Sequence, residues 1–196
     1  MKKILPICCC IIMLLLGGCQ SQEPQEEAFI RDHAFSEEEE SLLMTLPFDS
    51  EDRLLTYDVF DYSIPKTYHT VAFYVTAYKE GQIVWENSPL LTVVLSEDYS
   101  RKGKIGLFLD EKELKIQLWD DAEYGLGNKC DLTDLEINDV IRGSGMYPEE
   151  SFDLEGRSDL FLYGFEKEDR LKWPETKEEY LQDAEYVLIV SAQIFK

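Results

Sequence analysis

Histidine is the side chain that most often serves as a general base, and this 196-residue sequence contains two, His33 and His69. A serine or cysteine nucleophile generally needs such a base nearby. His33 lies in an acidic segment at the entrance to an expected helix, and His69 opens an expected strand, where a surface or edge role is the simpler interpretation. No serine stands in a Gly-x-Ser-x-Gly pattern. The sequence therefore predicts no catalytic residue.

One segment matches a nucleophile pattern in part. Residues 63–66, SIPK, fit Ser-x-x-Lys, but the following KTY at 66–68 is not Lys-Thr-Gly and no Ser-Asp-Asn occurs downstream. A proline also stands between the serine and the lysine. We interpret residues 63–66 as a turn between strands.

Carboxylates are abundant, with 40 Asp and Glu residues, but no metal-binding spacing such as Cys-x-x-Cys, His-Glu-x-x-His or an EF-hand loop is present. Asp134, Glu136 and Asn138 would share one side of an expected strand, and we interpret them as its solvated side rather than as a calcium site. No cofactor is expected. A carboxylate pair for glycoside hydrolysis is defined by its separation in space and one raised pKa, so a polysaccharide hydrolase remains an alternative.

Aromatic side chains offer a candidate binding surface. Tyr74 and Tyr78 lie four residues apart on the expected outer side of a strand, and Trp85 follows on the next strand. Tyrosine and tryptophan form flat, partly apolar surfaces with a polar edge, which suit a sugar ring or an extended peptide. Aromatic residues are also common in strands for packing reasons alone.

The N-terminus carries a targeting signal. Lys2 and Lys3 precede an uncharged, mostly aliphatic run over residues 4–16, which is too short to span a bilayer and fits a secretory signal. The tetrapeptide at 16–19, LGGC, resembles the lipobox of bacterial lipoproteins. That resemblance covers residues 1–19 only. It implies a diacylglyceryl group on Cys19, cleavage after Gly18 by signal peptidase II, and an extracytoplasmic protein anchored to a bacterial membrane.

The cysteine count agrees with this interpretation. Of five cysteines, three at positions 8–10 would leave with the signal and Cys19 would carry lipid, so Cys130 remains as the one free thiol. We expect Cys130 to be structural, because the neighbouring Asp131 disfavours a thiolate.

Charge and composition divide the chain into three parts. We assign residues 1–18 to the signal peptide, 19–35 to the lipidated cysteine and a flexible acidic tether, and 36–196 to a single β-rich domain. The formal net charge of −21 repels phosphate backbones and anionic head groups, which excludes nucleic acid and leaves the lipid as the membrane contact.

Period-two alternation dominates the folded part. Residues 70–78, TVAFYVTAY, place Val71, Phe73, Val75 and Ala77 on one side of a strand. The expected strands are 54–62, 70–78, a return strand from 83, 90–95, 104–109, 114–119, 134–141, 160–165 and 186–195. Such spacing predicts a mostly β fold, an antiparallel β-sandwich or a barrel-like domain with one or two short helices.

Two capping boxes predict the helices, one over 37–46 after Ser36 and one over 176–183. Residues 120–131 and 143–157 look like long surface loops.

These features predict a lipid-anchored cell-envelope protein of a non-catalytic binding or scaffolding type. The alternatives are an envelope hydrolase with paired carboxylates and an accessory or immunity-type lipoprotein that contacts a basic protein partner. An envelope polysaccharide and a basic protein are the two partner classes that remain.

Overall fold

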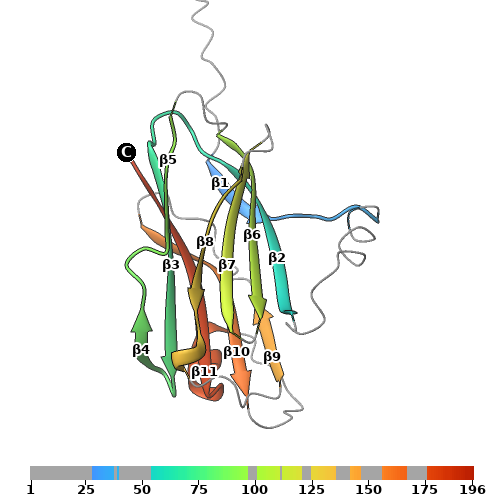
Figure 1. Cartoon of the computed structure of the whole chain (residues 1–196), viewed down its shortest axis with the longest axis vertical. Helices are drawn as coiled ribbons and strands as arrows, with labels where there is room; N and C mark the ends of the chain where they lie inside the picture. The colour runs from blue at the N-terminus through green and yellow to red at the C-terminus, as the bar shows by residue number, and fades with distance from the viewer. Residues whose placement is uncertain are drawn as a thin grey trace, which may run out of the picture.

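The protein is a sandwich of two antiparallel sheets that are not closed into a barrel, as the computed structural model in Figure 1 shows. The structure describes residues 28–37, 39, 54–96, 101–110, 112–120, 125–135, 142–146, 156–166 and 176–196. The mostly β fold expected from the alternation is confirmed. In the described part of the chain, no helix is long and apolar enough to cross a bilayer.

Sheet A contains, in spatial order, β1 (Phe29–Asp32), β2 (Leu54–Ser63), β6 (Lys102–Asp110), β7 (Glu113–Asp120) and β8 (Gly125–Asp131). Sheet B contains β4 (Gln82–Glu86), β3 (Thr70–Lys79), β11 (Tyr186–Phe195), β10 (Arg157–Glu166) and β9 (Arg142–Met146), and β5 (Leu91–Val94) also pairs with β3. Each pair of neighbouring strands in the described chain is antiparallel, so short hairpins such as β6–β7 connect neighbours directly.

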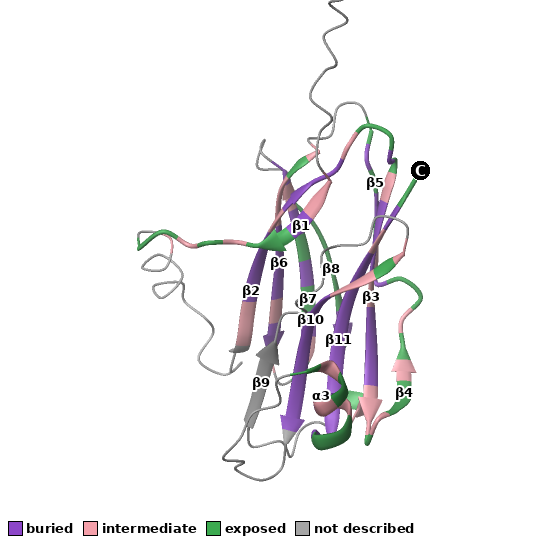
Figure 2. Cartoon of the chain, turned by 180° about the vertical axis from the view of Figure 1, so that it is seen from behind, coloured by how far each residue is buried: buried purple, intermediate pink, exposed green. Residues whose placement is uncertain are grey.

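The core lies between the two sheets and follows from the alternation along each strand. In β7, Leu114, Ile116 and Leu118 are buried, while Lys115 and Gln117 between them are exposed. The facing layer comes from β3, β10 and β11, whose burial Figure 2 shows along most of their length. Fully buried members of the core, from both sheets, include Tyr62, Phe73, Ile105, Leu107, Ile116 and Phe165. Burying one such side chain contributes roughly 1.5–3 kcal/mol.

A second, smaller apolar cluster covers the outer face of sheet B. The helix α3 (Lys177–Asp183) begins at Thr176, whose hydroxyl accepts a hydrogen bond from the Glu179 N–H, and its Tyr180 packs on Leu162 and Val187. Gly164 makes this contact close, because a Cβ there would lie 2.9 Å from the Tyr180 ring. The helix expected over 176–183 is therefore confirmed, and it shields one of the two outer faces.

One lateral side of the sandwich is closed by contacts between β5 and β8. The Asn128 side chain of β8 donates a hydrogen bond of 2.7 Å to the Leu90 carbonyl beside β5. The Arg101 guanidinium donates to the carbonyls of Pro65, Tyr68 and Leu95, which ties the turn after β2 to the end of β5. The interpretation of residues 63–66 as a turn between strands is confirmed.

Three expected boundaries are wrong. The supposed tether over 19–35 includes β1, which pairs with β2 and buries Ile30. The supposed loop 120–131 includes β8, and the supposed loop 143–157 includes most of β9. Glycines at 125, 127, 143 and 145 leave these strands without the side-chain alternation that would have identified them.

The strand expected over 134–141 is wrong at its start, because Thr133–Leu135 forms a 3₁₀ turn. Residues 136–141, and with them Glu136 and Asn138, lie outside the described residues. Of the helix expected over 37–46, residues 37 and 39 are described and are helical.

Replacing Gly164 by alanine tests the contact between α3 and sheet B. We expect G164A to lose about 1–3 kcal/mol of unfolding free energy, since the new methyl group overlaps the Tyr180 ring. Urea unfolding followed by fluorescence measures this change. The matched control, Gln182→Ala on the exposed side of α3, should change the unfolding free energy by less than about 0.5 kcal/mol. Equal stability of G164A and wild type would contradict the close contact.

Candidate functional site

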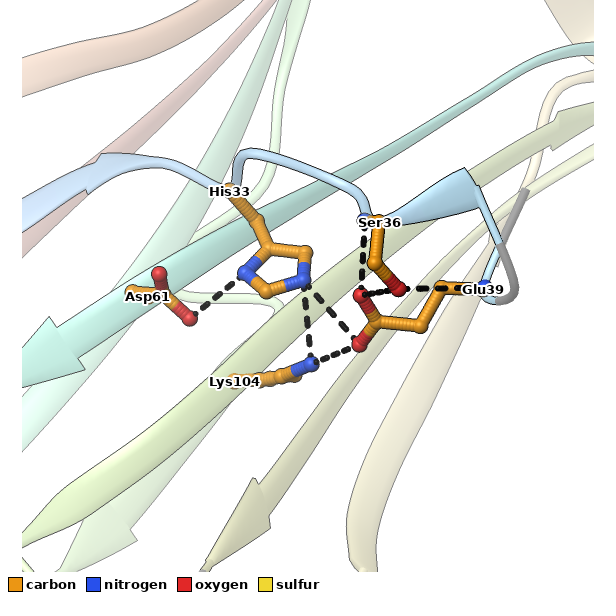
Figure 3. A network of polar contacts seen from close by, with 5 residues as sticks. All are labelled: His33, Ser36, Glu39, Asp61 and Lys104. Atoms are coloured by element: carbon orange, nitrogen blue, oxygen red, sulfur yellow. Dashed lines mark hydrogen bonds and ion pairs between the residues drawn. The ribbon is translucent and has the colours of Figure 1, made fainter.

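The outer face of sheet A carries a polar network that joins the N-terminal segment to the sheet (Figure 3). His33 follows β1 directly, and its N–H donates to the Val59 carbonyl of β2. Asp61 of β2 and Lys104 of β6 are register partners, so both side chains project from the same face. Ser36 and Glu39 complete the network from the chain segment after His33.

The imidazole of His33 is held at both nitrogens. Its Nδ1 lies 2.9 Å from Asp61 Oδ1, and its Nε2 lies 3.0 Å from Lys104 Nζ. Nε2 also lies 3.4 Å from Glu39 Oε1, so the ring contacts two carboxylates and one ammonium group.

Ser36 and Glu39 form the reciprocal capping box that the sequence predicts. The Ser36 N–H donates to Glu39 Oε2 over 2.9 Å, and the Glu39 N–H donates to Ser36 Oγ over 3.3 Å. Glu39 Oε1 accepts from Lys104 Nζ over 3.0 Å. The Ser36 backbone hydrogen bond, followed by the Lys104 hydrogen bond, lowers the pKa of Glu39 from 4.5 to about 2.

This network attaches the segment after β1 to sheet A and places no nucleophile against the His33 ring. The Asp61–His33 pair resembles the orienting half of a catalytic triad, but the position beyond Nε2 is filled by Lys104 and Glu39. The one hydroxyl in the network, that of Ser36, donates to Glu39 and does not contact His33. The arrangement therefore attaches residues 33–37 and 39 to sheet A.

Beside this network, Trp119 of β7 forms a flat surface over its neighbouring strands. A Cβ at Gly106 of β6 would lie 2.5 Å from Trp119 Cζ3, and one at Gly125 of β8 would lie 3.2 Å from Trp119 Cδ1. The indole thus extends over β6 on one side and β8 on the other, with glycine beneath both ends. Only the lack of side chains at these two positions allows the ring to lie this close to the sheet.

Further aromatic side chains border Trp119 on the same face. The Phe108 ring meets Trp119 edge-to-face at a centroid distance of 6.1 Å and an angle of 89°. Tyr57 is the register partner of Phe108, and Phe35 contacts Tyr57 at 6.3 Å. We name Phe35, Tyr57, Phe108 and Trp119 the aromatic row; all four are half-buried.

The polar groups around the aromatic row are mostly charge-balanced. Gln117, two residues before Trp119, is exposed on the same side. Glu113 pairs with Lys115 at 2.5 Å and with Lys129 at 2.6 Å, and these ion pairs lower its pKa. The face therefore offers hydrogen-bonding groups with little local excess of either charge.

The three aromatic residues singled out from the sequence do not form one surface. Trp85 is the register partner of Ala77 and packs against the main core, whereas Tyr74 and Tyr78 project from the opposite side of sheet B. Tyr74 lies under the Arg157 guanidinium, 4.2 Å from its ring centroid, and Tyr78 packs against the α3 cluster. The predicted platform of Tyr74, Tyr78 and Trp85 is wrong, since a bulge and the strand register separate its members.

The other candidates behave as structural residues. Cys130 is buried, and its burial raises the pKa of the thiol to about 11, as expected for a structural cysteine. Ser63 is buried at the end of β2 and Lys66 is exposed. No three metal-binding side chains come together within the described ranges.

Neither part of this face follows from local sequence patterns. His33 falls within the predicted tether, because the four residues of β1 beside a charged segment give little alternation. The glycine pair under Trp119 left no one-dimensional signal, because residues 106, 119 and 125 come together only through strand pairing.

No protein-family model matches this chain, and neither a curated protein nor a solved structure shows significant similarity to it.

The lowered pKa of Glu39 gives a pH-dependent prediction. The ionised Glu39 carboxylate stabilises the attachment of its segment to Lys104 of sheet A fully above pH 4.5. This contribution to stability is lost as the pH falls from 4.5 through about 2. Side-chain carboxyl NMR should therefore record a midpoint near 2 for Glu39. Lys104→Met should move the midpoint toward 4.5, whereas Lys66→Met, at an exposed turn lysine, should leave it in place. A midpoint near 4.5 in the wild type would refute the network.

Proposed function

We propose that the chain is a lipid-anchored cell-envelope protein that binds a saccharide of the envelope through the aromatic row and does not catalyse a reaction. The lipobox-like segment at 16–19 supports the anchor. The outer face of sheet A supports the binding role. The observation that carries the proposal is Trp119, whose indole spans three strands above Gly106 and Gly125.

A ring of this kind suits a pyranose. The apolar side of a sugar stacks on an aromatic ring, while its hydroxyl groups need hydrogen-bond partners at the rim. Trp119 supplies the flat ring and Phe108 stands at its edge. Gln117 and Lys115, both exposed on the same side of β7, supply donors and acceptors for the hydroxyl groups.

The carboxylates of this face favour binding over hydrolysis. A glycosidase needs one carboxylic acid whose pKa is raised, so that it is protonated when the leaving oxygen needs a proton. The pKa of Glu39, Glu113 and Asp131 is lowered in each case, by hydrogen bonds from Ser36, Lys115 and Thr133 respectively as the largest cause. These groups therefore stay ionised and act as hydrogen-bond acceptors.

The anchor is tested by replacing Cys19 with alanine in the full-length chain expressed in a bacterium. We expect wild type in the membrane fraction with a mass that corresponds to a chain beginning at lipidated Cys19, and C19A without added lipid and outside that fraction. The control Cys130→Ala should stay membrane-bound, since Cys130 is buried in the sandwich. A wild-type chain that begins at Met1, or that is released without lipid, would refute the anchor.

The binding face is tested with Trp119→Ala and chitotetraose as the probe, together with sedimentation of the protein with insoluble envelope polysaccharide. We expect W119A to bind at least about tenfold more weakly, since a lost stacking contact is on the order of 1.4 kcal/mol. Fluorescence quenching and calorimetry measure the affinity.

The control Tyr74→Ala removes an aromatic ring from the outer face of the other sheet and should bind as wild type does. Equal binding by W119A and wild type, equal weakening by Y74A, or no binding of either saccharide by the wild type would refute the proposal.

A further inference from the structure

Strand β4 exposes two adjacent apolar side chains. Ile83 is 59% exposed and Val84 is 49% exposed, and four of the five residues of β4 are exposed. Figure 2 shows the contrast with β3 beside it, which is buried along most of its length. Isolated exposed apolar residues are common on protein surfaces, but neighbours on an edge strand invite pairing with another chain.

The edge beside β3 is divided between two short strands. β5 pairs with Thr70 to Phe73, and β4 pairs with Thr76 to Lys79. The β5 end adjoins β8, whose Asn128 bonds the Leu90 carbonyl. β4 ends the order of sheet B, and none of the strands that the structure describes pairs with its outer side. In an antiparallel ladder, alternate residues of an edge strand turn their N–H and C=O groups outward.

The usual protection of an edge strand is weak here. Lysine or proline within the strand commonly blocks further pairing, and the sequence of β4, QIVWE, contains neither. Its one charged residue, Glu86, is held by Arg157 at 2.7 Å. The remaining feature that could block pairing is the bulge at Val84, where the register with β3 shifts. The segment from Gln82 to Ile83 beyond the bulge keeps a regular edge.

We propose that β4 is a docking edge at which an extended, basic peptide segment of another protein adds to sheet B as a further strand. Main-chain hydrogen bonds to the outer side of β4 would hold the segment, and Ile83 and Val84 would contact its apolar side chains. This surface is separate from the aromatic row, which lies on the other sheet.

The charges around the strand select the basic partner. The turn between β3 and β4 carries Glu80, whose N–H bonds the Glu185 carbonyl at 3.0 Å, and Gly81 lies against the Leu181 carbonyl of α3. Glu80 and Glu185 therefore lie together at this end of β4, beside Lys79, and the formal net charge of −21 on the chain favours a basic partner. A second copy of the chain would bring a further net charge of −21, so self-pairing is opposed.

The test uses an eight-residue peptide of alternating lysine and valine with a fluorescent label, titrated with the folded protein. We expect Ile83→Lys to weaken binding at least about tenfold, because it removes an apolar contact and places a like charge on the edge. Val94→Lys, at a residue 70% exposed on β5, is the matched control and should bind as wild type does. Equal urea midpoints would show that both variants fold.

Three further measurements separate strand addition from unspecific attraction. The same peptide with a central proline keeps its charge and should bind at least about tenfold more weakly. Amides of residues 82–86 should gain hydrogen-exchange protection when the peptide saturates the protein. The variant Glu80→Gln, which removes an acidic side chain from the turn before β4, should weaken binding at low salt.

The proposal is overturned if V94K weakens binding as much as I83K, if the proline peptide binds equally well, or if wild type does not bind at millimolar peptide. It is also overturned if sedimentation shows a dimer of wild type that I83K abolishes, since β4 would then serve a second copy.

Discussion

The apolar layer between the two sheets is the constraint on which the rest of this structure depends. The one described cysteine, Cys130, is a free thiol, so no disulfide joins the described strands and the sheets are held by side-chain packing. Packing of this kind requires every second residue of a central strand to point inward. The residues between them are thereby fixed on the outer faces, and Lys104, Phe108 and Trp119 are positioned by the burial of Ile105, Leu107 and Leu118.

Within the described part of the chain, the two outer faces differ in what covers them. On sheet B, α3 and the long Arg157 side chain cover Leu162, Val187 and Tyr74. On sheet A, residues 33–37 and 39 lie over β2 and β6, and the aromatic row is half-buried. A face with half-buried aromatic side chains and balanced charges differs from the strongly acidic average of the molecule. The contrast locates the proposed saccharide site on sheet A.

Local patterns predicted the strands whose side chains alternate. β3 and β11 match the expectation within one residue, and the capping box at Thr176 identified α3. The sequence did not predict β8 and β9, because their glycines contribute no alternation of side chains. It did not predict β1, because four residues beside a charged segment give little signal.

The functional surfaces were harder to predict than the strands. Whether an aromatic residue faces inward or outward depends on bulges: the register shift between Ala77 and Tyr78 is what separates Trp85 from Tyr78. The Trp119 surface required knowledge of three strands at once, since Gly106 and Gly125 are distant in sequence and adjacent only in the sheet. Charge alone likewise did not show that Lys104 would be held by His33 and Glu39.

The early position of β1 has a mechanical consequence. If membrane attachment is at Cys19, a pulling force from the bilayer enters the described part of the chain beside Phe29, at one end of a four-residue strand whose one described partner is β2. β1 contributes Ile30 alone to the core, so it would peel away while the sandwich stays intact. Release of Phe29–Asp32 would add roughly 13–14 Å of extended chain between Cys19 and the sandwich. Detachment would then stop at His33, which contacts Asp61 and Lys104. These contacts would therefore bear the force before the core does.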